Sequence, residues 1–276
     1  MEAKNLQVKL FSIIYYKGIA SEKFYIKGVF IIEYFTLANF YNPYTLNIFT
    51  DTSTIKVGKR KKPIWVSGFG ALAINGDNII EAVTRINTDC PINKGEIRGI
   101  KLGICLALKY NQFSNINIFS DSQISVLGIR DRIFNYVSGC RNHEMVLYKK
   151  VGGSINIMQN QDDYLEIIDL VIRNQLRINF WHVKAHVNTR NYKDLEMAAR
   201  VFQSSNNIRD SVDINLINYI SCNNNKIDSI CKKALNERDK SDYIFSPISF
   251  KANYFNQSIQ KYKNYINKSG GVMYGS

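Results

Sequence analysis

Residues 115–128 read NINIFSDSQISVLG, a short apolar run that stops on a carboxylate and leads directly into a helix-like pattern. The β-branched and aromatic residues of the run are typical of a buried strand. Ser120, Asp121 and Ser122 follow with side-chain oxygens of the kind that begin helices. The stretch therefore predicts a core strand, a carboxylate that faces outward at its end, and a helix.

A second stretch has the same shape. Residues 46–53 read LNIFTDTS, again an apolar run ending in a hydroxyl, an aspartate and a hydroxyl. If the two strands are neighbours in a parallel pair, about 4.8 Å apart, Asp51 and Asp121 crowd at the sheet edge where open α/β sheets place their sites. Two such anions need a cation between them.

A third acid lies on a predicted helix. Glu96 shares an i, i+4, i+7, i+11 stripe with Ile100, Gly103 and Ala107, so it begins a face that otherwise packs inward. Gly99 and Gly103 disfavour a helix unless its backbone must lie close against the sheet. A surface glutamate favoured by the helix dipole is the alternative for this position.

The C-terminal half adds a histidine and a fourth acid. His186 follows the predicted strand 177–184 in the motif HVKAH, which lacks both the helix and the glutamate of a zinc-protease site. Asn224 is predicted to cap a final helix and Asp228 to lie in its first turn, where helix capping alone would explain both residues.

Composition restricts the partner and the compartment. The 276 residues carry a net charge of +13, which suits a polyanion such as nucleic acid or merely aids solubility. Five cysteines without a CxxC pair, no apolar run of membrane length and no signal-peptide pattern predict a soluble cytoplasmic protein. The abundance of Asn, Ile, Tyr and Lys suggests an AT-rich coding sequence, as in a virus acting in its host cell, a phage or a low-GC microbe.

The motifs TDTS, NKGEIRGI, FSDSQISVLGI, HVKAH and NNNKIDSICKKAL, in this order, resemble type 1 ribonuclease H. The resemblance spans roughly residues 45–236. It implies an α/β, RNase H-like fold, a mixed five-stranded sheet with helices on both faces. The expected domains are a β-rich N-terminal extension (1–44), the catalytic domain (45–238) with a helical insertion at about 187–223 before the last core helix, and a basic, aromatic tail (239–276).

The resemblance also implies an activity, which is hydrolysis of the RNA strand of RNA–DNA hybrids with two Mg²⁺ or Mn²⁺ ions. Four acids would be the catalytic metal ligands, namely Asp51, Glu96, Asp121 and Asp228. His186 would assist proton transfer or product release. The oxygen-rich donor set independently favours hard divalent cations.

Six further residues are predicted to contact substrate. Asn93 and Gln123 match family positions that contact the sugar edge of the hybrid. Thr52 and Ser122 follow the two strand aspartates, and Lys59 and Lys61 belong to a basic loop that holds phosphates or is simply solvated. The family commonly has glycine where Thr52 stands and asparagine where Ile92 stands, so these two departures affect recognition of the hybrid more than metal binding.

Three alternatives differ in what they require. A proofreading exonuclease needs a second carboxylate where Ser53 stands, which argues against it. A DNA-directed or junction-resolving nuclease would share the fold but cleave branched DNA. A non-catalytic nucleic-acid-binding scaffold would be expected to lose acids from the cluster, and all four are present.

Overall fold

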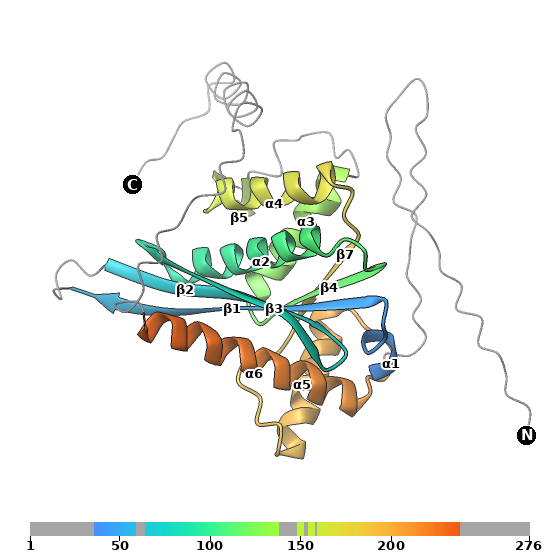
Figure 1. The fold of residues 1–276 in the computed structure, drawn as a ribbon. Helices are drawn as coiled ribbons and strands as arrows, with labels where there is room; N and C mark the ends of the chain where they lie inside the picture. The colour runs from blue at the N-terminus through green and yellow to red at the C-terminus, as the bar shows by residue number, and fades with distance from the viewer. Residues whose placement is uncertain (1–35, 59–63, 138–147, 152–153, 158, 238–276) are drawn as a thin grey trace, which may run out of the picture. The chain divides into compact units, whose positions relative to one another are not determined.

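A computed structural model describes residues 36–58, 64–137, 148–151, 154–157 and 159–237 (Figure 1). Its main sheet has five strands, which are β1 (Thr45–Val57), β2 (Ile64–Asn75), β3 (Asn78–Thr88), β4 (Asn115–Ser120) and β7 (Ile178–His182). Two short strands, β5 (Tyr148–Val151) and β6 (Ser154–Ile157), pair with each other in a separate two-stranded sheet. No described helix combines the length and apolarity needed to cross a bilayer.

The strands of the main sheet lie in the order β3-β2-β1-β4-β7. β2 is antiparallel to both of its neighbours, whereas β1, β4 and β7 are parallel. This order and these directions are those of the RNase H-like fold. The predicted mixed five-stranded sheet is confirmed, and so is the parallel pairing of the two strands that carry Asp51 and Asp121.

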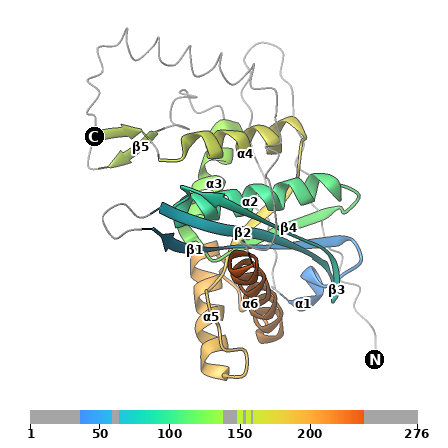
Figure 2. The same ribbon diagram turned by 60° about the vertical axis from the view of Figure 1, so that its left-hand side comes forward.

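Helices cover both faces of this sheet, as predicted (Figures 1 and 2). One face carries α2 (Ile92–Lys109), α3 (Gln123–Val137) and α4 (Gln161–Arg173), and the other carries α5 (Tyr192–Asn206) and α6 (Ile214–Asn236). Alternation of side chains along each strand supplies both cores. In β1, for example, Ile48 joins the α2 side and Phe49 joins the α6 side.

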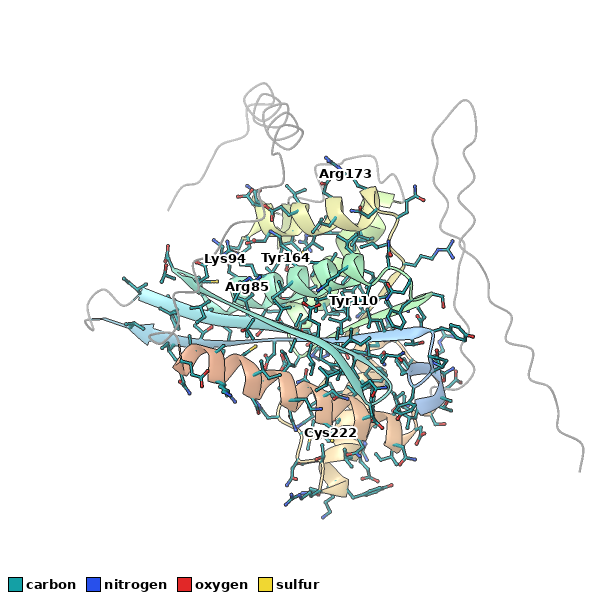
Figure 3. The ribbon with its side chains drawn as sticks, in the orientation of Figure 1. Arg85, Lys94, Tyr110, Tyr164, Arg173 and Cys222 are labelled. Atoms are coloured by element: carbon teal, nitrogen blue, oxygen red, sulfur yellow. The ribbon has the colours of Figure 1, made fainter. Side chains whose placement is uncertain are left out.

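Side-chain contacts tie the helical layers to each other and to the sheet. Tyr164 of α4, labelled in Figure 3, is buried in the core that α4 shares with α2 and α3. At the far end of α2, the hydroxyl of Tyr110 donates to Glu81 of the edge strand β3 at 2.7 Å. The buried face of α4 and the C-terminal end of α2 are therefore both held in place by side-chain contacts.

Two expectations about element boundaries are wrong. β1 does not stop at Asp51 but continues to Val57, because β2 remains paired with it after β4 has ended. Asn224 does not begin the last helix either, since α6 is one continuous helix whose N-cap is Asp213. The C-terminal part of the insertion expected at about 187–223 is therefore the first part of α6.

The domain ends are described in part. Of the N-terminal extension, residues 36–44 are described and contain a short helix, α1 (Leu37–Phe40), whose Phe40 is buried against Phe119 and Trp181. Residues 1–35, with the predicted β-rich runs, and residues 239–276 lie outside the described residues. The close packing of Phe40 means that the folded domain begins before β1.

Candidate functional site

The two strand aspartates meet where β4 ends beside β1. The last paired residues of these strands are Thr50 and Ser120, so the next residue of each chain, Asp51 or Asp121, leaves the pair at the same level. Thr52 donates its backbone N–H to Asp51 Oδ1 at 2.7 Å. The two carboxylates are thus placed by strand pairing, as the sequence predicted.

Glu96 reaches the aspartates because α2 lies very close to the sheet. A Cβ added at Gly95 would meet Thr52 Cγ2 at 2.4 Å, and one at Gly103 would meet Thr50 Cγ2 at 3.0 Å. At Gly99 the nearest atom would be the backbone oxygen of Asp51, at 3.4 Å. The glycines therefore let the helix backbone approach β1, which confirms the reason inferred for two of them.

Asp51, Glu96 and Asp121 form a cluster in which one oxygen of each carboxylate lies within 4.8 Å of the other two. We call these three residues the carboxylate triad. Asp51 and Glu96 are buried, with exposed fractions of 5% and 7%. Glu96 Oε2 is buried without a hydrogen-bond partner among the described residues. Such an oxygen costs free energy unless something positive reaches it.

Burial and mutual repulsion disfavour the charged forms of the triad. Burial raises the pKa of Asp51 to about 8, with further contributions from the charges of Asp121 and Asp228. Burial and the charges of Asp121 and Asp51 raise the pKa of Glu96 well above its usual range. Burial also raises the pKa of Asp121, although a hydrogen bond from Asn224 and the charge of His186 oppose the shift. Fully ionised, the triad would place three negative charges close together.

The triad matches the requirements of a divalent cation. It offers only carboxylate oxygens, which are the ligands of hard ions such as Mg²⁺ and Mn²⁺. A cation placed among them would balance charges that protein groups leave unbalanced and would contact the unpartnered oxygen of Glu96. The residues therefore fit a metal ion.

The fourth predicted ligand flanks the triad without joining it. Asp228 lies on α6 within hydrogen-bonding reach of Asp51, and its charge contributes to the shifts at Asp51 and Asp121. Its Oδ2 accepts from Lys232 Nζ at 2.6 Å and lies 3.6 Å from His186 Nδ1. The structure brings together all five residues predicted to be catalytic, but Asp228 already has a cationic partner.

Two residues near the triad were not predicted from the sequence to belong to the site. Asn224, expected to be a helix cap, lies in the middle of α6, is 2% exposed and hydrogen-bonds the side chain of Asp121. Lys232, in the motif CKKAL, was not predicted to belong to the site. Its i+4 spacing from Asp228 is nevertheless typical of an ion pair on a helix.

Two further residues, His182 and Asn206, hold the backbone of Asp121 in place through hydrogen bonds. His182 Nε2 lies 3.2 Å from the backbone oxygen of Asp121, and burial lowers the pKa of His182, so the neutral ring donates through Nε2. The side-chain amide of Asn206, at the end of α5, bonds both backbone groups of His182, at 3.0 and 2.8 Å. The amide of Asn206 thereby makes the hydrogen bonds that a neighbouring strand would otherwise make to the edge strand β7.

Replacing Asn206 with alanine should therefore lower stability by about 2 kcal/mol or more, since buried backbone groups of His182 lose their partners. For a domain of this size that corresponds to a fall in Tm of about 4–8 °C. Thermal unfolding followed by circular dichroism measures it. Ser204→Ala, at an exposed position of the same helix, is the matched control and should keep the wild-type Tm. An unchanged Tm in Asn206→Ala would show that the amide does not support β7.

The predicted substrate contacts surround the triad at different depths. Asn93, in the first turn of α2, and Gln123, at the start of α3, are exposed, and Ser122 is half-buried. Thr52 is buried, and its side chain fills the space beside Gly95. Lys59 and Lys61 lie outside the described residues.

Comparison with known proteins finds similarity at the level of structure. No protein-family profile matches the sequence, and no curated protein matches it. Prototype foamy virus protease–reverse transcriptase is similar over 58% of this chain at 14% identity and a TM-score of 0.41, and this match spans 20% of the length of that protein. The PFV RNase H domain is similar over 59% of this chain and 94% of the domain, at 14% identity and a TM-score of 0.40. LC11-RNase H1, isolated from compost and solved in complex with RNA/DNA hybrid, is similar over 58% of this chain and 98% of its own length, at 15% identity and a TM-score of 0.34.

Proposed function

We propose that this protein is a metal-dependent endonuclease that hydrolyses the RNA strand of RNA–DNA hybrids, using two Mg²⁺ or Mn²⁺ ions. The observation that carries the proposal is the carboxylate triad, in which three acids from different elements converge with a buried oxygen left unpartnered. Burial of uncompensated like charges is unfavourable for folding, so such an arrangement is expected at a functional site.

Each residue of the site has a role in this mechanism. Asp51 and Asp121 would hold both ions, Glu96 would hold one of them and Asp228 the other. Bound ions activate water and stabilise the leaving oxygen during phosphodiester hydrolysis. Asn224 fixes the orientation of Asp121 through its hydrogen bond. His186, whose side chain is 70% exposed, is free to approach substrate and to carry a proton to or from the reacting phosphate.

Substrate recognition rests on groups around the triad. The net charge of +13 favours a polyanion. Asn93 and Gln123 are exposed at the N-terminal ends of α2 and α3, where amide side chains can hydrogen-bond the 2′-hydroxyls that distinguish RNA from DNA. We propose Lys59 and Lys61 as phosphate contacts.

A cleavage assay tests the proposal directly. The full chain is incubated with Mg²⁺ or Mn²⁺ and labelled RNA–DNA hybrid, duplex DNA, branched DNA or single strands. We expect cleavage of the RNA strand of the hybrid alone and its loss in Asp121→Asn, which keeps the size of the side chain but removes its charge. The proposal fails if none of these substrates is cut at any metal concentration tested.

A DNA-directed or junction-resolving nuclease is the second candidate. It is favoured by Thr52, whose side chain is packed under α2 at a position where the resembled family commonly has glycine near the RNA. The same assay separates the two functions, because this candidate requires cleavage of branched or duplex DNA with the hybrid left intact.

A further inference from the structure

Asp228 differs from the carboxylate triad in already having a cation. Lys232 Nζ and His186 Nδ1 approach the same oxygen, Asp228 Oδ2, at 2.6 and 3.6 Å. The side chain of Asp228 is 14% exposed, so few other directions are open to a ligand. One of the two carboxylate oxygens of Asp228 is therefore already paired with a cation.

The lysine lies on the side of α6 that faces the triad. Lys232 follows Asp228 by one helical turn, and its ammonium interacts electrostatically with Asp51 as well as with Asp228. A positive charge at this point offsets part of the negative charge of the cluster. It also repels a divalent ion that approaches Asp51 and Asp228 from the same direction.

We propose that Lys232 is a built-in cation that occupies the position of the second metal ion. The triad then binds one divalent ion tightly, and a second ion binds only by displacing the lysine from Asp228. This inference rests on the proposed function, since it concerns the same metal centre.

The exposure of the lysine makes displacement feasible. The side chain of Lys232 is 53% exposed, so it can swing into solvent without breaking a core. Exposed ion pairs of this type are weak, whereas a divalent ion carries twice the charge and accepts several oxygen ligands at once. Occupancy of the second position is thereby set by competition between a tethered ammonium and the free metal concentration.

Calorimetric titration of the metal-free full chain with Mn²⁺ in the absence of substrate tests the inference. We expect two binding events in the wild type, a tight one and a weak one. In Lys232→Met the weak event should tighten at least about fivefold, which corresponds to about 1 kcal/mol, while the tight event stays unchanged. Two strong events in the variant against one detectable event in the wild type would support the inference equally.

Two variants serve as controls. Lys233→Met makes the same charge change at the next, exposed residue of α6 and should leave both events as in the wild type. Lys232→Arg retains the positive charge and should keep the second event weak. Equal effects of Lys232→Met and Lys233→Met, or no effect of Lys232→Met, would overturn the role of Lys232.

The tight event reports on the proposed function separately. If it is present and is lost in Glu96→Gln, the metal centre exists whatever the result for Lys232. If the wild type binds no Mn²⁺ at all, both the proposed function and the role of Lys232 are contradicted.

Discussion

Replacing Glu96 with glutamine is expected to abolish metal-dependent cleavage, lowering the rate by about 10³-fold or more. Glutamine keeps the volume and burial of the side chain but offers a neutral amide where the triad holds its unpartnered oxygen. Loss of a metal ligand removes several kcal/mol of transition-state stabilisation, and each 1.36 kcal/mol is a factor of about ten. Single-turnover cleavage at saturating Mn²⁺ measures the effect on the chemical step.

The control for this variant is another buried carboxylate outside the site. Asp163 of α4 is 7% exposed and pairs with Arg98 at 3.2 Å. Asp163→Asn also neutralises a buried acid, yet it should cleave at the wild-type rate below its unfolding temperature. Comparable activity of Glu96→Gln and the wild type would mean that Glu96 holds no essential ion.

The metal-free protein should lose stability as the pH rises from about 4 to about 8. Asp51 and Glu96 have folded-state pKa values raised above those of the unfolded chain, to about 8 for Asp51. Within this window the folded state binds more protons than the unfolded state, so the free energy of unfolding falls with pH. Thermal unfolding in a chelator across this range measures the trend, and a Tm that rises between these limits would contradict it.

The same imbalance predicts that Asp51→Asn stabilises the metal-free protein at pH 8. Asparagine avoids the cost of burying the charge of Asp51, which we expect to contribute about 2 kcal/mol, or a rise in Tm of about 4–8 °C. Saturating Mn²⁺ should stabilise the wild type by about 3 kcal/mol at a hundred times its Kd and should not stabilise Asp51→Asn. Asp163→Asn, which leaves Arg98 without this partner, should instead lower the Tm.

The strand aspartates could be predicted because their placement depends on local pattern alone. Two short apolar runs ending in an aspartate predict strands, and parallel pairing brings equivalent ends together. The structure pairs these strands in parallel, as expected. Glu96 could be predicted for a similar reason, since helical periodicity and Gly99 and Gly103 together indicate which face of α2 approaches the sheet.

The remainder of the site depends on contacts that local pattern does not encode. Asn224 was predicted to begin the last helix, because asparagine favours caps. In the middle of α6, Asn224 instead hydrogen-bonds Asp121, and Asn225 donates to the backbone oxygen of Val187 at 2.8 Å. Asn223 donates within the helix, to the backbone oxygen of Tyr219 at 3.0 Å. Asn206 gives no local signal at all, since its partner His182 lies 24 residues earlier in the chain.

The central claim is that Asp51, Glu96 and Asp121 together hold a divalent cation. An X-ray structure of the protein soaked in Mn²⁺, with anomalous differences measured near the manganese edge, tests it most directly. We predict an anomalous peak within coordination distance, about 2.0–2.6 Å, of an oxygen from each of these three carboxylates. Full-occupancy manganese bound elsewhere, with no peak between the three carboxylates, would contradict the account.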